Sequence, residues 1–287
     1  MRARPRFDEV WAVDWSGARG RPRNIAVARL TADARMPELL RPAHGPVWTR
    51  GAVLDRLAQA IGEGRRVLAG FDFAFGLPVE TLTPLGLAGC RDMPALWAAV
   101  DRVCAAAPDL HGGPFVAGAP AGVFWTRGPR PPGWNAALRL TDTRCAQTSG
   151  ALPESVTKLV GAKQVGLAAL SGMRFLAALR ARCGPALAIW PAEAPERASV
   201  AVEIFPTIHR RLSTGRGGKI RDAATLSRAL DVLGCATPSL GRTPSDDETD
   251  ALIAAAGMRA TLRASRAFAL PAAPRARREG WIFGVDP

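Results

Sequence analysis

A short apolar run near the N-terminus, Val10 to Val13, ends in an aspartate and then breaks into small residues. An apolar run bounded in this way predicts a buried central strand. Asp14 stands at its carboxyl end, and a carboxylate there is costly to desolvate unless another group compensates its charge. Two interpretations of Asp14 follow: it is the first ligand of a metal site, or it is a turn-forming residue before Ser16 and Gly17.

The first third of the chain predicts the order strand, strand, strand, helix, strand. The expected elements are strands at 10–15, 24–30, 46–48 and 66–73 and a helix that begins after an N-cap at Thr49. Asp72 lies near the end of the last of these strands. The short connections suit hairpins, whereas the helix supplies a crossover to a parallel strand.

Residues 74–152 have a different composition, with many prolines and glycines and one expected helix at 93–107. We interpret this segment as an insertion packed on the core of a single domain that spans residues 1–287, because ordered irregular loops favour such a composition. Four arginines in it, at 127, 130, 139 and 144, either line a cleft or lie on a solvated loop surface.

The second half of the chain is regular again. The expected elements are helices at 165–182, 223–233 and 243–258 and strands at 186–190, 199–205 and 280–285. Glu203 interrupts an apolar strand, so it is either half-exposed by strand alternation or drawn to the site, and we predict the site. Ser245 and Glu248 form the capping box of the last helix. Asp247 and Asp250, three residues apart, project from one face of it.

Four acids therefore form the predicted site: Asp14, Asp72, Asp247 and Asp250. Side chains at the ends of adjacent strands lie roughly 5 Å apart, and like charges this close raise each other's pKa unless a cation relieves the repulsion. Oxygen ligands without His or Cys favour Mg²⁺ or Mn²⁺. Two such ions can clamp the attacking water and the leaving oxygen of a phosphodiester. We predict these four acids as catalytic metal ligands, with Glu203 as an outer ligand or water-positioning base.

Substrate-binding candidates lie beside glycines. Lys158, Lys163 and Gln164 precede a helix expected at 165, and free amide groups at a helix N-terminus favour anions. Ser16 belongs to a strand-to-glycine turn suited to phosphate. The lysine segment is not a P-loop, because the sequence GxxxxGK[ST] is absent, and Gly217-Gly218-Lys219 is not one either.

Six motifs, AVDWSGA, GFDFAFGLP, KQVGLAAL, VEIFP, DDETDALIAA and EGWIFGV, together resemble a family of predicted nucleases with the ribonuclease H fold (domain of unknown function 429). The element order is similar to that of the ribonuclease H-like superfamily, and DETDAL resembles the acidic helix of its Holliday-junction resolvases. The resemblance implies an α/β fold with a mixed, five-stranded-type sheet flanked by helices. It also implies acids at Asp14, Asp72, Glu203 and Asp250. The insertion departs from the resolvases and leaves the substrate open.

Three functions follow from these patterns. The first is a metal-dependent nuclease that hydrolyses phosphodiester bonds in nucleic acid. The second is a phosphotransferase or ATPase of the actin and sugar-kinase type, although we find no second copy of the strand–Asp–Gly unit. The third is a catalytically silent module of the same fold that binds nucleic acid or another partner.

Composition bears on partners and location. The net charge of +13 favours nucleic acid as a partner, although the near absence of lysine weakens this indication. No apolar run reaches the roughly 18 residues of a membrane span, and no apolar signal segment precedes the first strand. Five scattered cysteines suit a reducing compartment. We therefore expect a cytoplasmic protein without a membrane partner.

Overall fold

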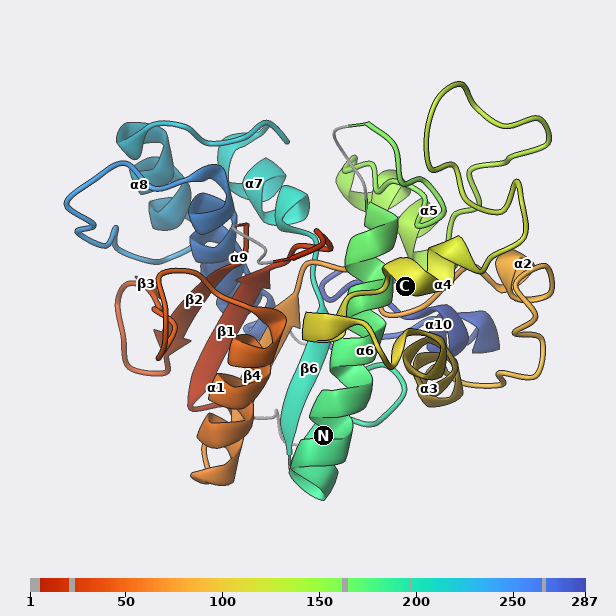
Figure 1. The fold of residues 1–287 in the computed structure, drawn as a ribbon. Coiled ribbons are helices and arrows are strands. Elements are labelled where there is room, and N and C mark those ends of the chain that lie inside the picture. The colour runs from red at the N-terminus through yellow and green to blue at the C-terminus, as the bar shows by residue number, and fades with distance from the viewer. Residues whose placement is uncertain (1–5, 21–23, 162–164, 197, 265–266) are drawn as a thin grey trace.

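The computed structural model describes residues 6–20, 24–161, 165–196, 198–264 and 267–287. Its centre is a six-stranded sheet with the order β3-β2-β1-β4-β6-β5 (Figure 1). The strands are β1 (Glu9–Asp14), β2 (Ala26–Thr31), β3 (Glu38–Leu39), β4 (Val67–Phe71), β5 (Leu187–Ile189) and β6 (Ser199–Glu203). β1 pairs antiparallel with β2 and parallel with β4, and β6 lies parallel between β4 and β5. The predicted α/β class and mixed sheet are confirmed, with six strands in place of five.

Two of the predicted strands are wrong. Residues 46–48 form no strand, and the edge strand is β3. Trp48 is instead buried, and its Nε1–H donates to the carbonyl of Leu40 in the preceding loop at 3.3 Å. The segment 280–285 makes only one bridge to the sheet, between Glu203 and Ile282. Gly280 and Gly284 have φ values of +88° and +85°. This left-handed conformation is incompatible with a continuous strand.

Ten α-helices are found in the described residues. They are α1 (Arg50–Gly62), α2 (Val79–Leu82), α3 (Met93–Cys104), α4 (Gly113–Ala117), α5 (Leu140–Ser149), α6 (Val165–Cys183), α7 (Pro206–Thr214), α8 (Ala223–Val232), α9 (Asp246–Leu262) and α10 (Pro274–Glu279). The predicted N-cap of α1 is confirmed, since Thr49 Oγ1 accepts from the amide of Ala52 at 3.0 Å. The predicted capping box of α9 is also confirmed, because Ser245 and Glu248 each accept from the other's amide.

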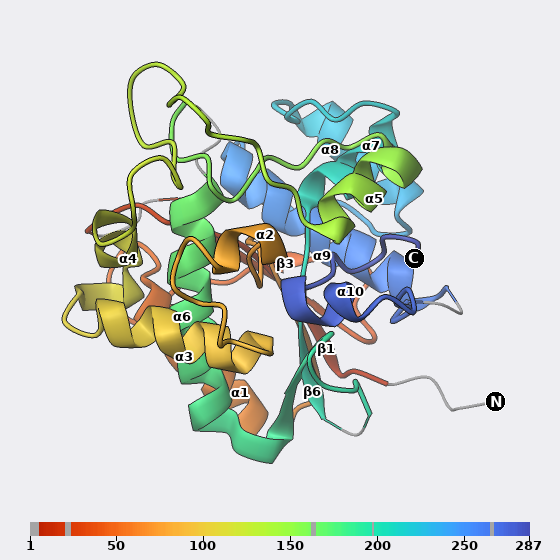
Figure 2. The same ribbon diagram turned by 90° about the vertical axis from the view of Figure 1, so that its right-hand side faces the viewer.

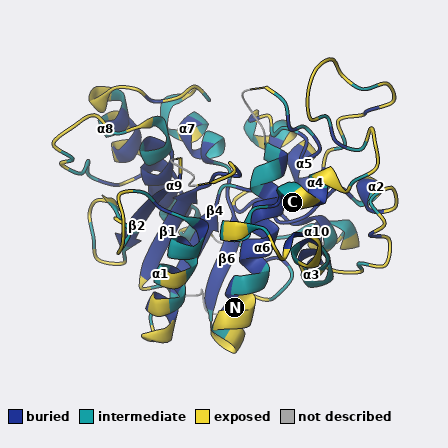
Figure 3. Ribbon diagram, in the orientation of Figure 1, coloured by how far each residue is buried: buried dark blue, intermediate teal, exposed yellow. Residues whose placement is uncertain are grey.

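Helices cover both faces of the sheet. Trp11 and Val13 of β1 share an apolar cluster with side chains of α1 and α6, whereas Val10 and Ala12 share a second cluster with α9. Successive side chains of a strand point to opposite faces, so the two clusters lie on opposite sides of the sheet. Figure 1 shows α1 and α6 in front of the strands and α9 behind them. In Figure 3 the strands and the inward helix faces are buried and the outer turns are exposed.

The segment 74–152 contains α2 to α5 and packs beside α6, as Figure 2 shows for α3 and α4. Phe75 and Trp97 belong to the same apolar cluster as Phe71 of β4. Trp97 Nε1–H donates to the carbonyl of Phe75 at 2.7 Å, which ties α3 to the chain that leaves β4. The segment is therefore joined to the sheet through buried contacts. Among the described helices, none is long and apolar enough to cross a membrane.

Candidate functional site

Two aspartates follow the ends of adjacent parallel strands and point to the same face of the sheet. Asp14 is the last residue of β1, and alternation places it on the face of Val10 and Ala12, where α9 packs. Asp72 follows the end of β4, and its amide donates to the carbonyl of Val13 at 3.0 Å, which continues the pairing of the two strands. Both carboxyls therefore reach the rim of the sheet beneath the first turns of α9.

Helix α9 lies close to this rim because β4 has a glycine beneath it. A Cβ on Gly70 would lie 2.5 Å from Sδ of Met258, a residue of α9. Such a contact is far shorter than carbon and sulfur permit, so a larger residue at this position would displace the Met258 side chain that packs α9 on the sheet. The N-terminal turns of α9 carry Asp247 and Asp250, which share one helix face.

The electrostatics of the site indicate that the four aspartates are close neighbours. The pKa of Asp14 is raised well above its ordinary value, first by burial and then by the charges of Asp72, Asp250 and Asp247. Burial and Asp250 raise the pKa of Asp72 to about 7. The pKa of Asp247 is also raised, mainly by burial. The Asp14 carboxyl lies within hydrogen-bonding reach of both Asp72 and Asp247. In the absence of a cation, a proton shared between Asp14 and either neighbour relieves the repulsion between their charges.

Asp250 differs from the other three because two basic side chains of the protein bind it. Arg210 from α7 donates to Oδ1 of Asp250, and Lys219 from the loop after α7 donates to Oδ2 at 2.5 Å. Thr207 Oγ1 accepts from Arg210 at 2.7 Å and orients it. Partial burial disfavours the charge on Lys219, but Asp250 outweighs this effect and raises the pKa of Lys219. In the part of the chain that the structure describes, no basic side chain forms an ion pair with Asp14, Asp72 or Asp247.

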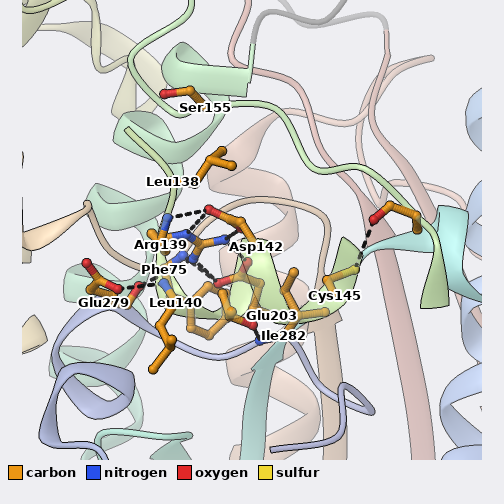
Figure 4. Close-up of polar contacts among 12 residues, drawn as sticks. Phe75, Leu138, Arg139, Leu140, Asp142, Cys145, Ser155, Glu203, Glu279 and Ile282 are labelled. Carbon is orange, nitrogen blue, oxygen red and sulfur yellow. Dashed lines mark hydrogen bonds and ion pairs between the residues drawn. The ribbon is translucent and has the colours of Figure 1, made fainter. Parts of the chain in front are cut away.

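Glu203 lies at the same edge of the sheet but on the other face. Its register partner in β4 is Phe71, whose side chain belongs to the cluster of α1 and α6. Arg139 donates to both carboxylate oxygens of Glu203, at 2.5 and 2.7 Å, and to Asp142 (Figure 4). The amide of Phe75 also donates to Glu203 at 3.0 Å. Glu203 is thus bound within the protein and is not among the groups that shift the pKa of Asp14.

The predicted substrate-binding residues have varied surroundings. Ser16 is buried, its Oγ accepts from the amide of Ala18 at 3.3 Å, and its carbonyl accepts from Arg50 Nε at 3.0 Å. Lys158 forms an ion pair of 2.9 Å with Glu154. Lys163 and Gln164 lie outside the described residues, so their predicted role stays a prediction. Of the predicted site residues, the structure therefore brings together the four aspartates.

Sequence reasoning gave no role to Arg210 and Lys219. A signal was present, since both belong to a basic, glycine-rich segment that precedes the acidic helix by about thirty residues. The pairing with Asp250 depends on how α7 and α9 pack, which local sequence patterns do not encode.

The donor set suits a hard divalent cation, because it consists of carboxylate oxygens with raised pKa values. Asp14, Asp72 and Asp247 are the residues able to hold such an ion, and Asp250 would first have to exchange Arg210 or Lys219 for it. The ligand atoms are not prearranged: across the described ranges, no group of three or more His, Cys, Asp or Glu side chains has metal-binding geometry. Binding would therefore require small side-chain rotations.

Comparisons with protein-family models, with curated proteins and with solved structures gave no match for this chain.

Proposed function

We propose that this protein is a metal-dependent nuclease with a ribonuclease H-like fold. The strand order β3-β2-β1-β4, with an antiparallel hairpin followed by a parallel strand, supports the fold assignment. So does the late acidic helix α9 on one face of the sheet. Three of the six sequence motifs that resemble the family of predicted nucleases lie in these elements: AVDWSGA at the end of β1, GFDFAFGLP at the end of β4 and DDETDALIAA in α9.

One observation carries the proposal: three buried or half-buried carboxyls from three separate elements meet at one rim without an ion pair among the described residues. Burying acids in this way destabilises the fold. A cluster retained at such a cost indicates a function, and perturbed carboxyl groups at the carboxyl ends of parallel strands are typical of active sites.

Asp14, Asp72 and Asp247 would hold Mg²⁺ or Mn²⁺, which when bound activates a water and stabilises negative charge on a phosphodiester. Arg210 and Lys219 lie beside these acids and would bind a nonbridging phosphate oxygen of the substrate. Asp250 orients both basic side chains toward the rim. The net charge of +13 favours association with a nucleic acid backbone.

The test is cleavage of fluorescently labelled DNA and RNA in the presence of Mn²⁺. We expect the wild type to cleave and Asp14→Asn to lose at least about a hundredfold in rate, because the substitution removes a central carboxylate. Asp246→Asn is the control: Asp246 lies next to Asp247 in the first turn of α9, is half-exposed and pairs with Arg221. Absence of cleavage by the wild type with any divalent cation would refute the proposal.

Two alternatives give different results in simple assays. A phosphotransferase or ATPase would turn over ATP, although the described residues form one such sheet and not two. A catalytically silent module would bind nucleic acid without any stabilisation by a divalent cation.

A further inference from the structure

A pocket of about 220 Å³ opens beside the acidic cluster. It lies between the edge of the sheet formed by β2 and β3, the loop at residues 40–48 and the first turn of α9. Asp247 belongs to its wall and also to the acidic cluster. The pocket therefore adjoins the candidate active site at Asp247.

Most of the residues that line the pocket have apolar side chains. They include Leu40, Pro46, Val47 and Trp48. Trp48 is buried, and its Nε1–H donates to the carbonyl of Leu40. The amide of Leu40 in turn donates to the carbonyl of Val27 in β2 at 2.8 Å, so the loop is tied to the sheet. Such a preformed cavity loses little conformational entropy when a ligand enters it.

Most polar groups of the pocket are already satisfied within the chain. Ser245 and Glu248 exchange hydrogen bonds in the capping box of α9. Arg242 donates to both carboxylate oxygens of Glu248, at 2.7 and 2.5 Å. The lining contains two arginines and two acids, so its formal charge balances. An uncharged group with flat apolar surfaces therefore fits the interior better than a phosphate does.

The volume limits the size of the occupant. Sites for complete small molecules usually measure about 300–1,000 Å³, so this pocket suits one ring system that belongs to a larger ligand. Because the pocket adjoins Asp247, the remainder of that ligand would extend over the acidic cluster.

We propose that the pocket binds one unpaired nucleobase of a nucleic acid whose backbone phosphate lies at the acidic cluster, an inference that rests on the proposed function. A base inside a duplex is stacked and paired and does not reach a recessed pocket unless it is extruded. The preferred substrate is therefore single-stranded, or carries an unpaired base at the cleavage position. Apolar contact with the pocket walls tolerates any base, so recognition depends on strandedness more than on sequence.

The experiment compares the affinity of fluorescein-labelled single-stranded DNA with that of an oligonucleotide of equal length built from abasic units, in Ca²⁺ and by fluorescence anisotropy. We expect the wild type to bind the base-containing strand about tenfold more tightly, or better. Val47→Trp fills the pocket and should abolish this preference. Leu152→Trp is the control, since Leu152 is 69% exposed on a loop and is not in the lining. Pro46→Trp, on the exposed rim, serves if Val47→Trp fails to fold.

The results separate this inference from the nuclease proposal. Equal affinity of the wild type for both strands, a preference that persists in Val47→Trp, or tighter binding of a blunt duplex would overturn the base pocket, even if Mn²⁺-dependent cleavage is observed. A base preference that Val47→Trp removes, without cleavage of any substrate, would support the pocket and overturn the nuclease. A protein that binds no oligonucleotide overturns both.

Discussion

Two groups of buried acids lie at the same edge of the sheet, on opposite faces, and they differ in what neutralises them. On the face of α1 and α6, Arg139 binds both Glu203 and Asp142 (Figure 4). On the face of α9, Asp14, Asp72 and Asp247 have no basic partner in ion-pair contact within the described ranges. The charges of the first group are neutralised within the chain, whereas those of the second group would need an external cation.

The pKa values express the same contrast. Burial disfavours the charge on Arg139, but Asp142 and Glu203 outweigh it and raise its pKa above the ordinary value. Burial raises the pKa of Glu203, and Arg139 opposes this. For Asp14 the neighbouring acids add to the effect of burial, and only Lys219 opposes it. A buried acid that forms an ion pair with an arginine is thus assigned a structural role. A buried acid that is surrounded by other acids is a candidate for a functional role.

The largest effect is expected at Arg139. Arg139→Met leaves Glu203 and Asp142 buried without a counter-ion, which should lower the free energy of unfolding by about 3–5 kcal/mol, measured by urea denaturation. Arg91→Met, at an exposed position, is the control and should change stability by less than about 0.5 kcal/mol. Equal stability of the two variants would mean that the ion pairs of Arg139 with Glu203 and Asp142 do not stabilise the fold.

The second effect concerns Asp14, Asp72 and Asp247, which form no ion pair among the described residues. Mn²⁺ at about a hundred times its dissociation constant should stabilise the wild type by about 2.7 kcal/mol, seen as a rise in melting temperature. Asp247→Asn should remove this rise and Asp246→Asn should keep it, although both residues lie in the first turn of α9. A similar rise in both variants would place the ion elsewhere.

The third effect is a pH dependence that Asp72 imposes on the metal-free protein. Its pKa is raised from 3.8 to about 7, so the folded state holds the proton more tightly than the unfolded state does. Asp72 therefore costs nothing below pH 3.8 and destabilises the fold increasingly as the pH rises toward 7. Asp72→Asn should be more stable than the wild type by about 2 kcal/mol at pH 8 and equally stable near pH 4. Parallel stability curves for the two proteins would contradict the account.

The smallest effect is expected at Lys219, which is 40% exposed and shares Asp250 with Arg210. Lys219→Gln should lower stability by less than about 1 kcal/mol, as for other exposed ion pairs. It should also tighten Mn²⁺ binding, because Asp250 loses a competing cation. Titration calorimetry measures the second effect, and weaker binding of Mn²⁺ would show that Asp250 stays paired with Arg210 and does not bind the ion.

Local patterns predicted much of this architecture. The apolar runs ending at Asp14 and Asp72, and the cap formed by Ser245 and Glu248, are short-range signals, and the structure places them in β1, at the end of β4 and at the start of α9. The face of Glu203 was not predictable, because it depends on the register of β6 against Phe71. The partners of Asp250 were missed for the same kind of reason: they come from another helix and its loop.

Helix α7 was missed although its signals were visible. Pro206 occupies its first turn, and Gly215 ends it in the left-handed conformation with φ of 71°. Both are usual boundary residues. Pro206 thus begins the helix that supplies Arg210.

Anomalous diffraction from crystals soaked in Mn²⁺ tests the central claim most directly. The account predicts a peak at the rim of the sheet with carboxylate oxygens of Asp14, Asp72 and Asp247 about 2 Å away. Crystals that bind Mn²⁺ only elsewhere, or in which none of these three carboxyls contacts an ion at saturating Mn²⁺, would contradict it.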